Sequence, residues 1–451
     1  MSTSLASLNI TQSSASQGSG IDVTAVVDQI LESERGPENI MKQQDIDLQT
    51  EESALKSLNS GLSALLDKIN ALKDPLGALV QNVASSSDTS VLTATAQTSA
   101  APGSHIVVVK NLSSTGTAYS DPVTDANTTF GTGVITLQIG GMSHDIKVDS
   151  NNNTLTTLVQ AINQQNLGVT ASIISDDSGA RLALVSNTTG AAGDLTITAN
   201  TSELVMHKGS PGQDASLTID GLPFSSATNT VTGAIPGVTL NLVSSAPNSE
   251  VQVNVGPDRS GAAQAVRDFV TAYNSVITAI NSQYQYDSTT NQGGVLASDS
   301  SVRTLQSLLL SDVTYSVSGN NGLVNLASLG VNMADDGTLS VDSSKLNDVL
   351  ANHYSDFQNF FQASNTGYAQ HFSAALDSLT DPTQGILNVD LAQNLSMQKS
   401  LTSQIADFED RLAIRQQQLI TQYSQIDTAL REYPVLMQQI SSQLGSLPTF
   451  K

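Results

Sequence analysis

Residues 48–76 read LQTEESALKSLNSGLSALLDKINALKDPL, with an aliphatic side chain at every seventh position. Apolar residues that repeat at heptad positions a and d are typical of a helix that packs along one face. The pattern predicts a helix of roughly 40 Å that ends at Asp74-Pro75, since the residue before a proline avoids helical geometry. The a positions are Met41, Leu48, Leu55, Leu62, Ile69 and Leu76, and the d positions are Leu58, Leu65 and Leu72.

A second heptad pattern lies near the other end of the chain and predicts a helix over residues 390–444. Pro434 falls inside this helix and should kink or break it, because proline removes one backbone hydrogen bond. Past Tyr423 the second apolar row shifts by one position. The a positions are Ile405, Leu412, Leu419, Ile426, Tyr433 and Ile440, and the second row holds Leu401 and Phe408 and then Leu430, Met437 and Leu444.

The chain between these helices changes character. Residues 83–257 hold short runs of β-branched residues bounded by turn residues, which predict strands, with one short helix at 155–163. Helical periodicity returns after Pro257, with helices predicted near 266–280, 300–310 and 343–361 and a strand at 338–341. The strands are expected at 105–109, 134–139, 169–174, 181–185, 195–198, 238–242 and 251–255.

This order predicts a multidomain α+β protein. Long terminal coiled-coil helices form a stalk or leg, and one or two β-rich domains are inserted between them. We expect an N-terminal region and leg helix at 1–40, a stalk helix at 41–90, an inner β domain at 91–110 and 212–257, an outer inserted β domain at 111–211, a helical stalk domain with a small hairpin at 258–389, and a C-terminal leg at 390–451.

Composition excludes several classes of function. The net charge of the 451 residues is −23, so nucleic acid is not an expected partner, because phosphate contacts need clustered Lys and Arg. Cysteine is absent, which excludes disulfides and thiolate metal sites. Residues 1–20 carry no charged side chain and lack the apolar run of a cleavable signal, and no apolar segment is long enough to span a membrane.

The residues predict no catalytic group, no cofactor and no metal ligand. Asp176-Asp177 and Asp335-Asp336 each precede a turn, where Asp accepts hydrogen bonds from nearby backbone. The histidines are not spaced as metal ligands, and no phosphate-binding loop or nucleophile elbow is present.

The heptad positions are the candidate interaction residues. We expect the N-terminal helix to pair within the chain, and we expect residues 395–444 to be buried mainly against other subunits, because that apolar stripe exceeds what the shorter helix can cover. The candidate contact residues are Leu48, Leu55, Leu62, Ile69, Leu401, Ile405, Phe408, Leu412, Leu419, Ile426, Leu430, Met437, Ile440 and Leu444.

Three motifs occur in a fixed order along the chain. Gly20-Ile21-Asp22 precedes Glu34-Arg35-Gly36-Pro37, Ile162-Asn163 lies in the β region, and Asp336-Gly337-Thr338-Leu339 precedes the last helices. Together they resemble the flagellar filament cap family, also called hook-associated protein 2. The residues that carry the resemblance most clearly are Gly20, Ile21, Asp22, Glu34, Arg35, Ile162 and Asn163.

The resemblance implies a non-enzymatic protein at the distal tip of the bacterial flagellum, exported by a type III apparatus without a cleavable signal. It implies a homo-oligomeric plate of roughly four to six copies that helps flagellin fold and insert. The other partners that it implies are hook-associated junction proteins and an export chaperone.

Three alternatives remain open on the sequence. A hook–filament junction protein is expected to combine terminal coiled coils with β inserts in the same way. A surface adhesin could bind host mucin or glycan through loops at 111–133 and 186–215. A secreted hydrolase is a third alternative, for which the sequence offers no catalytic constellation.

Overall fold

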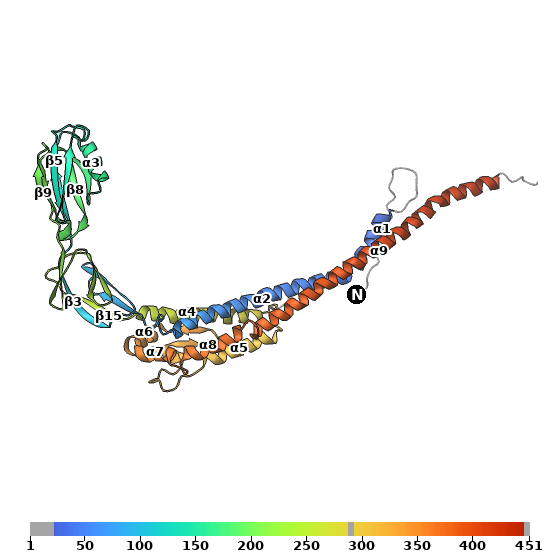
Figure 1. Cartoon of the computed structure of the whole chain (residues 1–451). Coiled ribbons are helices and arrows are strands. Elements are labelled where there is room, and N and C mark those ends of the chain that lie inside the picture. The colour runs from blue at the N-terminus through green and yellow to red at the C-terminus, as the bar shows by residue number, and fades with distance from the viewer. Residues whose placement is uncertain (1–21, 287–292, 446–451) are drawn as a thin grey trace, which may run out of the picture. The chain divides into compact units, whose positions relative to one another are not determined.

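The computed structural model describes residues 22–286 and 293–445, with side chains as far as residue 443. The chain divides into two compact units (Figure 1). The helical unit comprises residues 1–70, 267–346 and 359–451, and the β unit comprises residues 71–266 and 347–358. Long terminal helices flank inserted β-sheets, which confirms the predicted fold class.

Six helices lie wholly or mainly in the described part of the helical unit, together with three short elements. The helices are α1 (Val23–Glu34), α2 (Gly36–Lys73), α4 (Arg259–Gln283), α5 (Ser300–Val313), α8 (Tyr368–Thr380) and α9 (Ile386–Gly445). A two-stranded sheet of β16 (Val331–Met333) and β17 (Leu339–Val341) follows a 3-10 turn at Leu326–Leu329. The helices α6 (Ser343–Asn352) and α7 (Tyr354–Gln362) each divide between the two units.

Local sequence sets the starts of the first two helices. The Asp22 carboxylate accepts a hydrogen bond from the Ala25 N–H at 3.1 Å and so caps α1. Gly36-Pro37 opens α2, where a proline costs nothing because the first helical N–H groups have no partner in the helix.

The seam of α2 is the core of the helical unit. Leu55, Leu62 and Ile69 are at most 3% exposed, and so are the intervening d positions. A Cβ atom on Gly61 would lie 3.2 Å from Val276, so α2 and α4 pack closely here. Aromatic rings extend this core from α4 to α8, with Phe269 edge-on to Phe372 at 5.5 Å.

The helices α2 and α9 run antiparallel within this unit (Figure 1). The residue numbers of the paired side chains change in opposite directions along the two helices. Lys42 pairs with Glu409, Glu52 with Gln398, and Asn59 with Asn388. Polar groups therefore join the two long helices along much of α2.

Two separate hydrophobic cores fill the β unit. The first lies between a five-stranded sheet and a three-stranded sheet. In spatial order the larger sheet holds β1 (Asn82–Ser86), β15 (Val251–Pro257), β3 (Gly103–Asn111), β11 (Ala215–Ile219) and β12 (Leu222–Ser226). The smaller holds β13 (Thr230–Ile235), β14 (Val238–Leu242) and β2 (Leu92–Ala96).

The second core packs two further sheets and α3 (Leu155–Gln164). One sheet holds β10 (Met206–Lys208), β4 (Thr115–Ser120), β8 (Gly179–Thr189) and β7 (Val169–Asp176). The other holds β6 (Met142–Val148), β5 (Gly133–Ile139) and β9 (Leu195–Asn200). The hairpins β5–β6 and β11–β12 use the same kind of turn, because Gly140-Gly141 and Asp220-Gly221 all have positive φ.

The helix α2 ends at Lys73, which confirms the end predicted at Asp74-Pro75, but Leu76, placed among the heptad positions, lies outside it and is 78% exposed. Three other expectations are corrected by these elements. Strand β1 lies within the segment 41–90 that was assigned to the stalk helix. The helix predicted at 343–361 is two helices separated at His353. Of the kink or break expected at Pro434, the break is excluded, because α9 continues through this residue.

Replacing Leu62 by alanine should destabilise the helical unit by about 2–5 kcal/mol, because the leucine side chain is fully buried and its removal leaves a cavity. Chemical unfolding followed by circular dichroism measures the change. The matched control is Ile40→Ala on the same helix, where the side chain is 62% exposed and the expected loss is below about 0.5 kcal/mol. Equal losses in both variants would contradict the assignment of the seam to the core.

Candidate interaction surface on the terminal helices

Helix α1 packs against the middle of α9. Val27 and Leu31 form a buried cluster with Leu412 and Leu419, and all four are at most 7% exposed. Val23, Ile30, Phe408 and Tyr423 pack around this cluster and are partly buried. The N-terminal helix therefore covers part of the apolar stripe of the C-terminal helix.

A network of charged groups links α9 to the turn at which α1 passes into α2. The carboxylate of Glu38 is only 1% exposed and accepts hydrogen bonds from Arg35, at 2.8 Å, and from Lys42. Lys42 also donates to Glu409 of α9 at 3.2 Å, while Glu34 pairs with Arg415 at 3.5 Å.

The bond from Lys42, together with the positive charges of Arg35 and Lys42, lowers the pKa of Glu38 even though burial opposes this change. Because Glu38 holds both cations at once, it fixes the direction in which the chain turns from α1 into α2.

The predicted contact residues that the structure describes fall into four groups. Leu55, Leu62 and Ile69 are buried inside the helical unit. Leu48, Leu401, Ile405 and Phe408 are half-buried, whereas Leu412 and Leu419 are buried under α1 of the same chain. Ile426, Leu430, Met437 and Ile440 are 41–48% exposed, and the side chain of Leu444 lies outside the described residues.

The expectation that residues 395–444 open mainly toward other subunits is therefore corrected for the middle of α9. Leu412 and Leu419 are covered by Val27 and Leu31, a long-range pairing that heptad spacing cannot reveal. Past Tyr423 the stripe is exposed in this chain, and it is wider than the heptads indicate, because Val435 and Leu436 are also more than half exposed.

The motif residues have structural roles where the structure describes them. Asp22 caps α1, Glu34 and Arg35 join the charged network, and Ile162 is fully buried in the second β core. Gly20 and Ile21 lie outside the described residues.

The side-chain amide of Asn163 bonds to the backbone of β7 as a neighbouring strand would. Its Nδ2 donates to the Ala171 carbonyl at 2.9 Å, and its Oδ1 accepts from the Ala171 N–H at 2.8 Å. This pair of bonds holds α3 against β7. Asn274 makes the same pair of bonds with Leu339, and so holds α4 to β17.

Glu38 and Lys42 were not among the predicted residues. Their spacing of four on a helix, directly after Pro37, is the signal that could have identified an ion pair. Its burial could not be anticipated, because that depends on α9, more than 350 positions away in the sequence.

Models of known protein families match three parts of this chain. The models for the N- and C-terminal parts of flagellar hook-associated protein 2 match residues 19–115 and 212–434, and the model for the flagellin hook IN motif matches residues 134–188, which include Ile162 and Asn163. The B-type flagellar hook-associated protein 2 of Pseudomonas aeruginosa is 31% identical over 401 residues, which cover 81% of this chain and 83% of the relative. The chain belongs to the flagellar hook-associated protein 2 family.

Two further similarities agree with the membership in this family. The A-type flagellar hook-associated protein 2 of P. aeruginosa is 26% identical and is aligned over 95% of this chain and 96% of its own length. The crystal structure of the D1-D2-D3 domains of the flagellar cap protein from Escherichia coli superposes with a TM-score of 0.52 at 27% identity, covering 76% of this chain and 99% of that chain.

As a member of the hook-associated protein 2 family, the protein is a structural, non-enzymatic cap of the flagellar filament tip. Within the described residues, no three His, Asp or Glu side chains gather to hold a metal ion. No helix among them is both long enough and apolar enough to cross a membrane.

The charged network of this cap protein should respond to acid through Glu38. Its folded pKa lies below the ordinary value of 4.5, so it stabilises the protein above that pH, and the contribution is lost as pH falls below 4.5. Glu38→Gln should lower the melting temperature at pH 7, and its difference from the wild type should shrink as the pH drops to 3.

The control is Glu32→Gln, because Glu32 faces the same Arg35 at 3.8 Å but is 75% exposed. It should have no measurable effect at either pH. A Glu38 difference that stays constant between pH 7 and pH 3 would show that the lost carboxylate charge is not the cause.

Proposed function

We propose that copies of this chain assemble into a closed plate of roughly four to six at the filament tip, and that the terminal helices α1 and α9 form the leg contacting flagellin and its neighbours. The plate helps each exported flagellin subunit to fold and insert. The hook-associated junction proteins are further partners in this proposal.

The exposed end of α9 carries this proposal. Seven apolar side chains between residues 426 and 440 are 41–62% exposed, although α1 already covers the stripe before them. These residues are Ile426, Leu430, Tyr433, Val435, Leu436, Met437 and Ile440. A single exposed leucine needs no explanation, but a continuous apolar stripe of this length is typical of an interaction surface.

Helix energetics favour a role in reversible contacts. A helix of about 20 residues without a packing partner is only marginally stable in water, and Pro434 removes one of its backbone hydrogen bonds. The end of α9 therefore gains much of its order from the partner that covers it. Ordering on contact lowers the net affinity, which suits a cap that must release after each inserted subunit.

Two further parts of the proposal rest on family membership. The N-terminal residues direct export through the flagellar type III apparatus without cleavage, and an export chaperone covers the C-terminal helix before secretion. The β unit supplies the plate, with an inner domain at 91–110 and 212–257 and an outer domain at 111–211. The two separate hydrophobic cores of this unit support that division.

The double substitution Ile426→Asn and Leu430→Asn should reduce assembly, because it places two polar groups in the proposed contact. We expect light scattering of the full-length protein to shift from oligomer toward monomer. We also expect the variant to restore swimming poorly in a strain that lacks its own cap protein.

The matched control is Val389→Asn with Leu395→Asn. These side chains are 48% and 45% exposed on the same helix, but they lie before the proposed contact surface. The control should keep the wild-type mass and motility. Equal losses from both pairs, or loss from neither, would contradict the role of the α9 end.

A further inference from the structure

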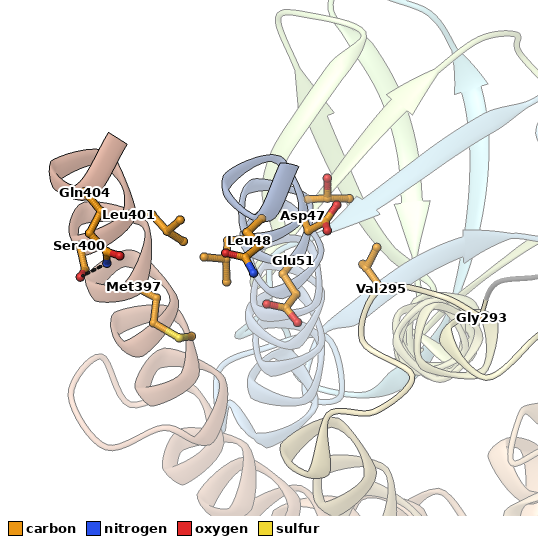
Figure 2. A pocket seen from close by; sticks show the side chains of 11 residues that line it. Asp47, Leu48, Glu51, Gly293, Val295, Met397, Ser400, Leu401 and Gln404 are labelled. Carbon is orange, nitrogen blue, oxygen red and sulfur yellow. Dashed lines mark hydrogen bonds between the residues drawn. The ribbon is translucent and has the colours of Figure 1, made fainter. Parts of the chain in front are cut away.

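A groove of about 850 Å³ opens along α2 within the helical unit, with α9 on one side of α2 and Gly293 and Val295 on the other (Figure 2). Leu48 of α2 and Met397 and Leu401 of α9 line it, and Val295 completes the apolar wall from the segment before α5. Leu48 and Leu401 are predicted contact residues, and neither is fully buried. The side chains of Val295 and Met397 are 43% and 44% exposed.

Two carboxylates stand on the α2 side of this groove. Asp47 and Glu51 lie one helical turn apart and line it together with the apolar side chains (Figure 2). Burial raises the pKa of Glu51, and the negative charges of Asp299, Asp390 and Asp47 raise it further, against a hydrogen bond that Asn394 donates at 3.1 Å. The groove therefore combines apolar walls with uncompensated negative charge.

The lysines on these stretches of α2 and α9 do not neutralise the groove. Lys42 pairs with Glu38 and Glu409, and Lys56 pairs with Glu52. Lys399 is exposed and lies about 200° around α9 from Met397 and Leu401, so it is directed away from the groove. In addition, one buried oxygen of Asp390, Oδ2, receives no hydrogen bond within the described part of the chain.

We propose that this groove binds a helix of a different protein that presents an arginine or lysine within an aliphatic stripe. The stem of such a side chain packs on Leu48, Leu401 and Met397, and its charged end lies between Asp47 and Glu51. Aliphatic neighbours one turn before and after it fill the rest of the groove.

Charge and geometry both favour a foreign helix over this chain. A second copy carries the same net charge of −23, which disfavours it as the occupant of this acidic groove, in contrast to the apolar end of α9 that we propose for self-assembly. The exposed end of α9 is part of one continuous helix with the groove wall, and Gln404 and Ile426 are separated by roughly 30 Å along it, so that end cannot fold back. It also carries Asp427 and Glu432 beside its only arginine, Arg431.

This inference goes beyond the proposed function and does not depend on it. The groove lies on a different part of α9 from the exposed end, so substitutions in one leave the other unchanged. Its occupant is defined by chemistry, as a cationic amphipathic helix.

The test uses the full-length chain and a fluorescent helical peptide of about 14 residues, or four turns, whose leucine stripe holds one central arginine. A second peptide with glutamate in place of that arginine is the charge control. We expect fluorescence anisotropy to show saturable binding of the arginine peptide and none of the glutamate peptide. Glu51→Gln should weaken binding about fivefold, as loss of one half-exposed ion pair does.

Three further variants locate the peptide. Leu48→Gln should weaken binding because it removes an apolar wall, whereas Ile46→Gln changes an exposed side chain of the same helix and should have no effect. Asp67→Asn removes an exposed charge from α2 outside the groove and should also leave binding unchanged.

Several outcomes would overturn the proposal. Equal binding of the two peptides would show that charge does not select the occupant. Unchanged affinity in Glu51→Gln and Leu48→Gln would place the peptide elsewhere, and no binding at about 1 mM peptide would exclude the site. A lower oligomer mass for Glu51→Gln or Leu48→Gln would show that a second copy fills the groove instead.

Discussion

Burial of the leucine seam of α2 is the interaction on which the rest of the helical unit depends. Leu55, Leu62 and Ile69 join three segments that are far apart in the sequence, because α4 packs on one side of α2 and α9 runs antiparallel beside it. Without this seam α2 would lose the core that it shares with α4 and α9. The charged network at Glu38 extends the same alignment past the end of the seam, where apolar contacts are fewer.

The burial of α9 changes along its length, and this change separates its roles. Leu387 is buried in the helical unit, Leu412 and Leu419 are buried under α1, and from Ile426 onward the apolar side chains are exposed. One helix thus belongs to a stable core at its start and to a two-helix contact in its middle, and its apolar end is exposed. If that end is the contact surface that we propose, the folded body stays independent of the contacts that form and break.

The sequence predicts the elements with strong periodicity and misses those without it. The two heptad helices and the strands rich in Val and Ile were found, whereas β1 (NVASS) and β4 (TGTAYS) are polar strands whose order comes from neighbouring strands. Helix α8 was not predicted either. Its apolar residues pack against the aromatic rings of α4, a contact that the sequence of α8 alone does not reveal.

For the candidate surface, spacing identified the apolar stripe but not what covers it. The contact between α1 and α9, like the two bonds from Asn163 to Ala171, joins residues by tertiary packing that no local pattern encodes. Pro434 shows the reverse case, because a strong local preference against helix is overridden along a helix of 60 residues.

The pairing of β1 with β15 has a consequence for how this architecture varies. Asn82 is paired with Pro257, so the chain enters and leaves the intervening sheets through two adjacent antiparallel strands about 5 Å apart. Residues 83–256 therefore leave and rejoin the rest of the chain at one strand pair. Because both connections lie side by side, the β region could be lengthened, shortened or replaced without moving the points at which the chain enters and leaves it.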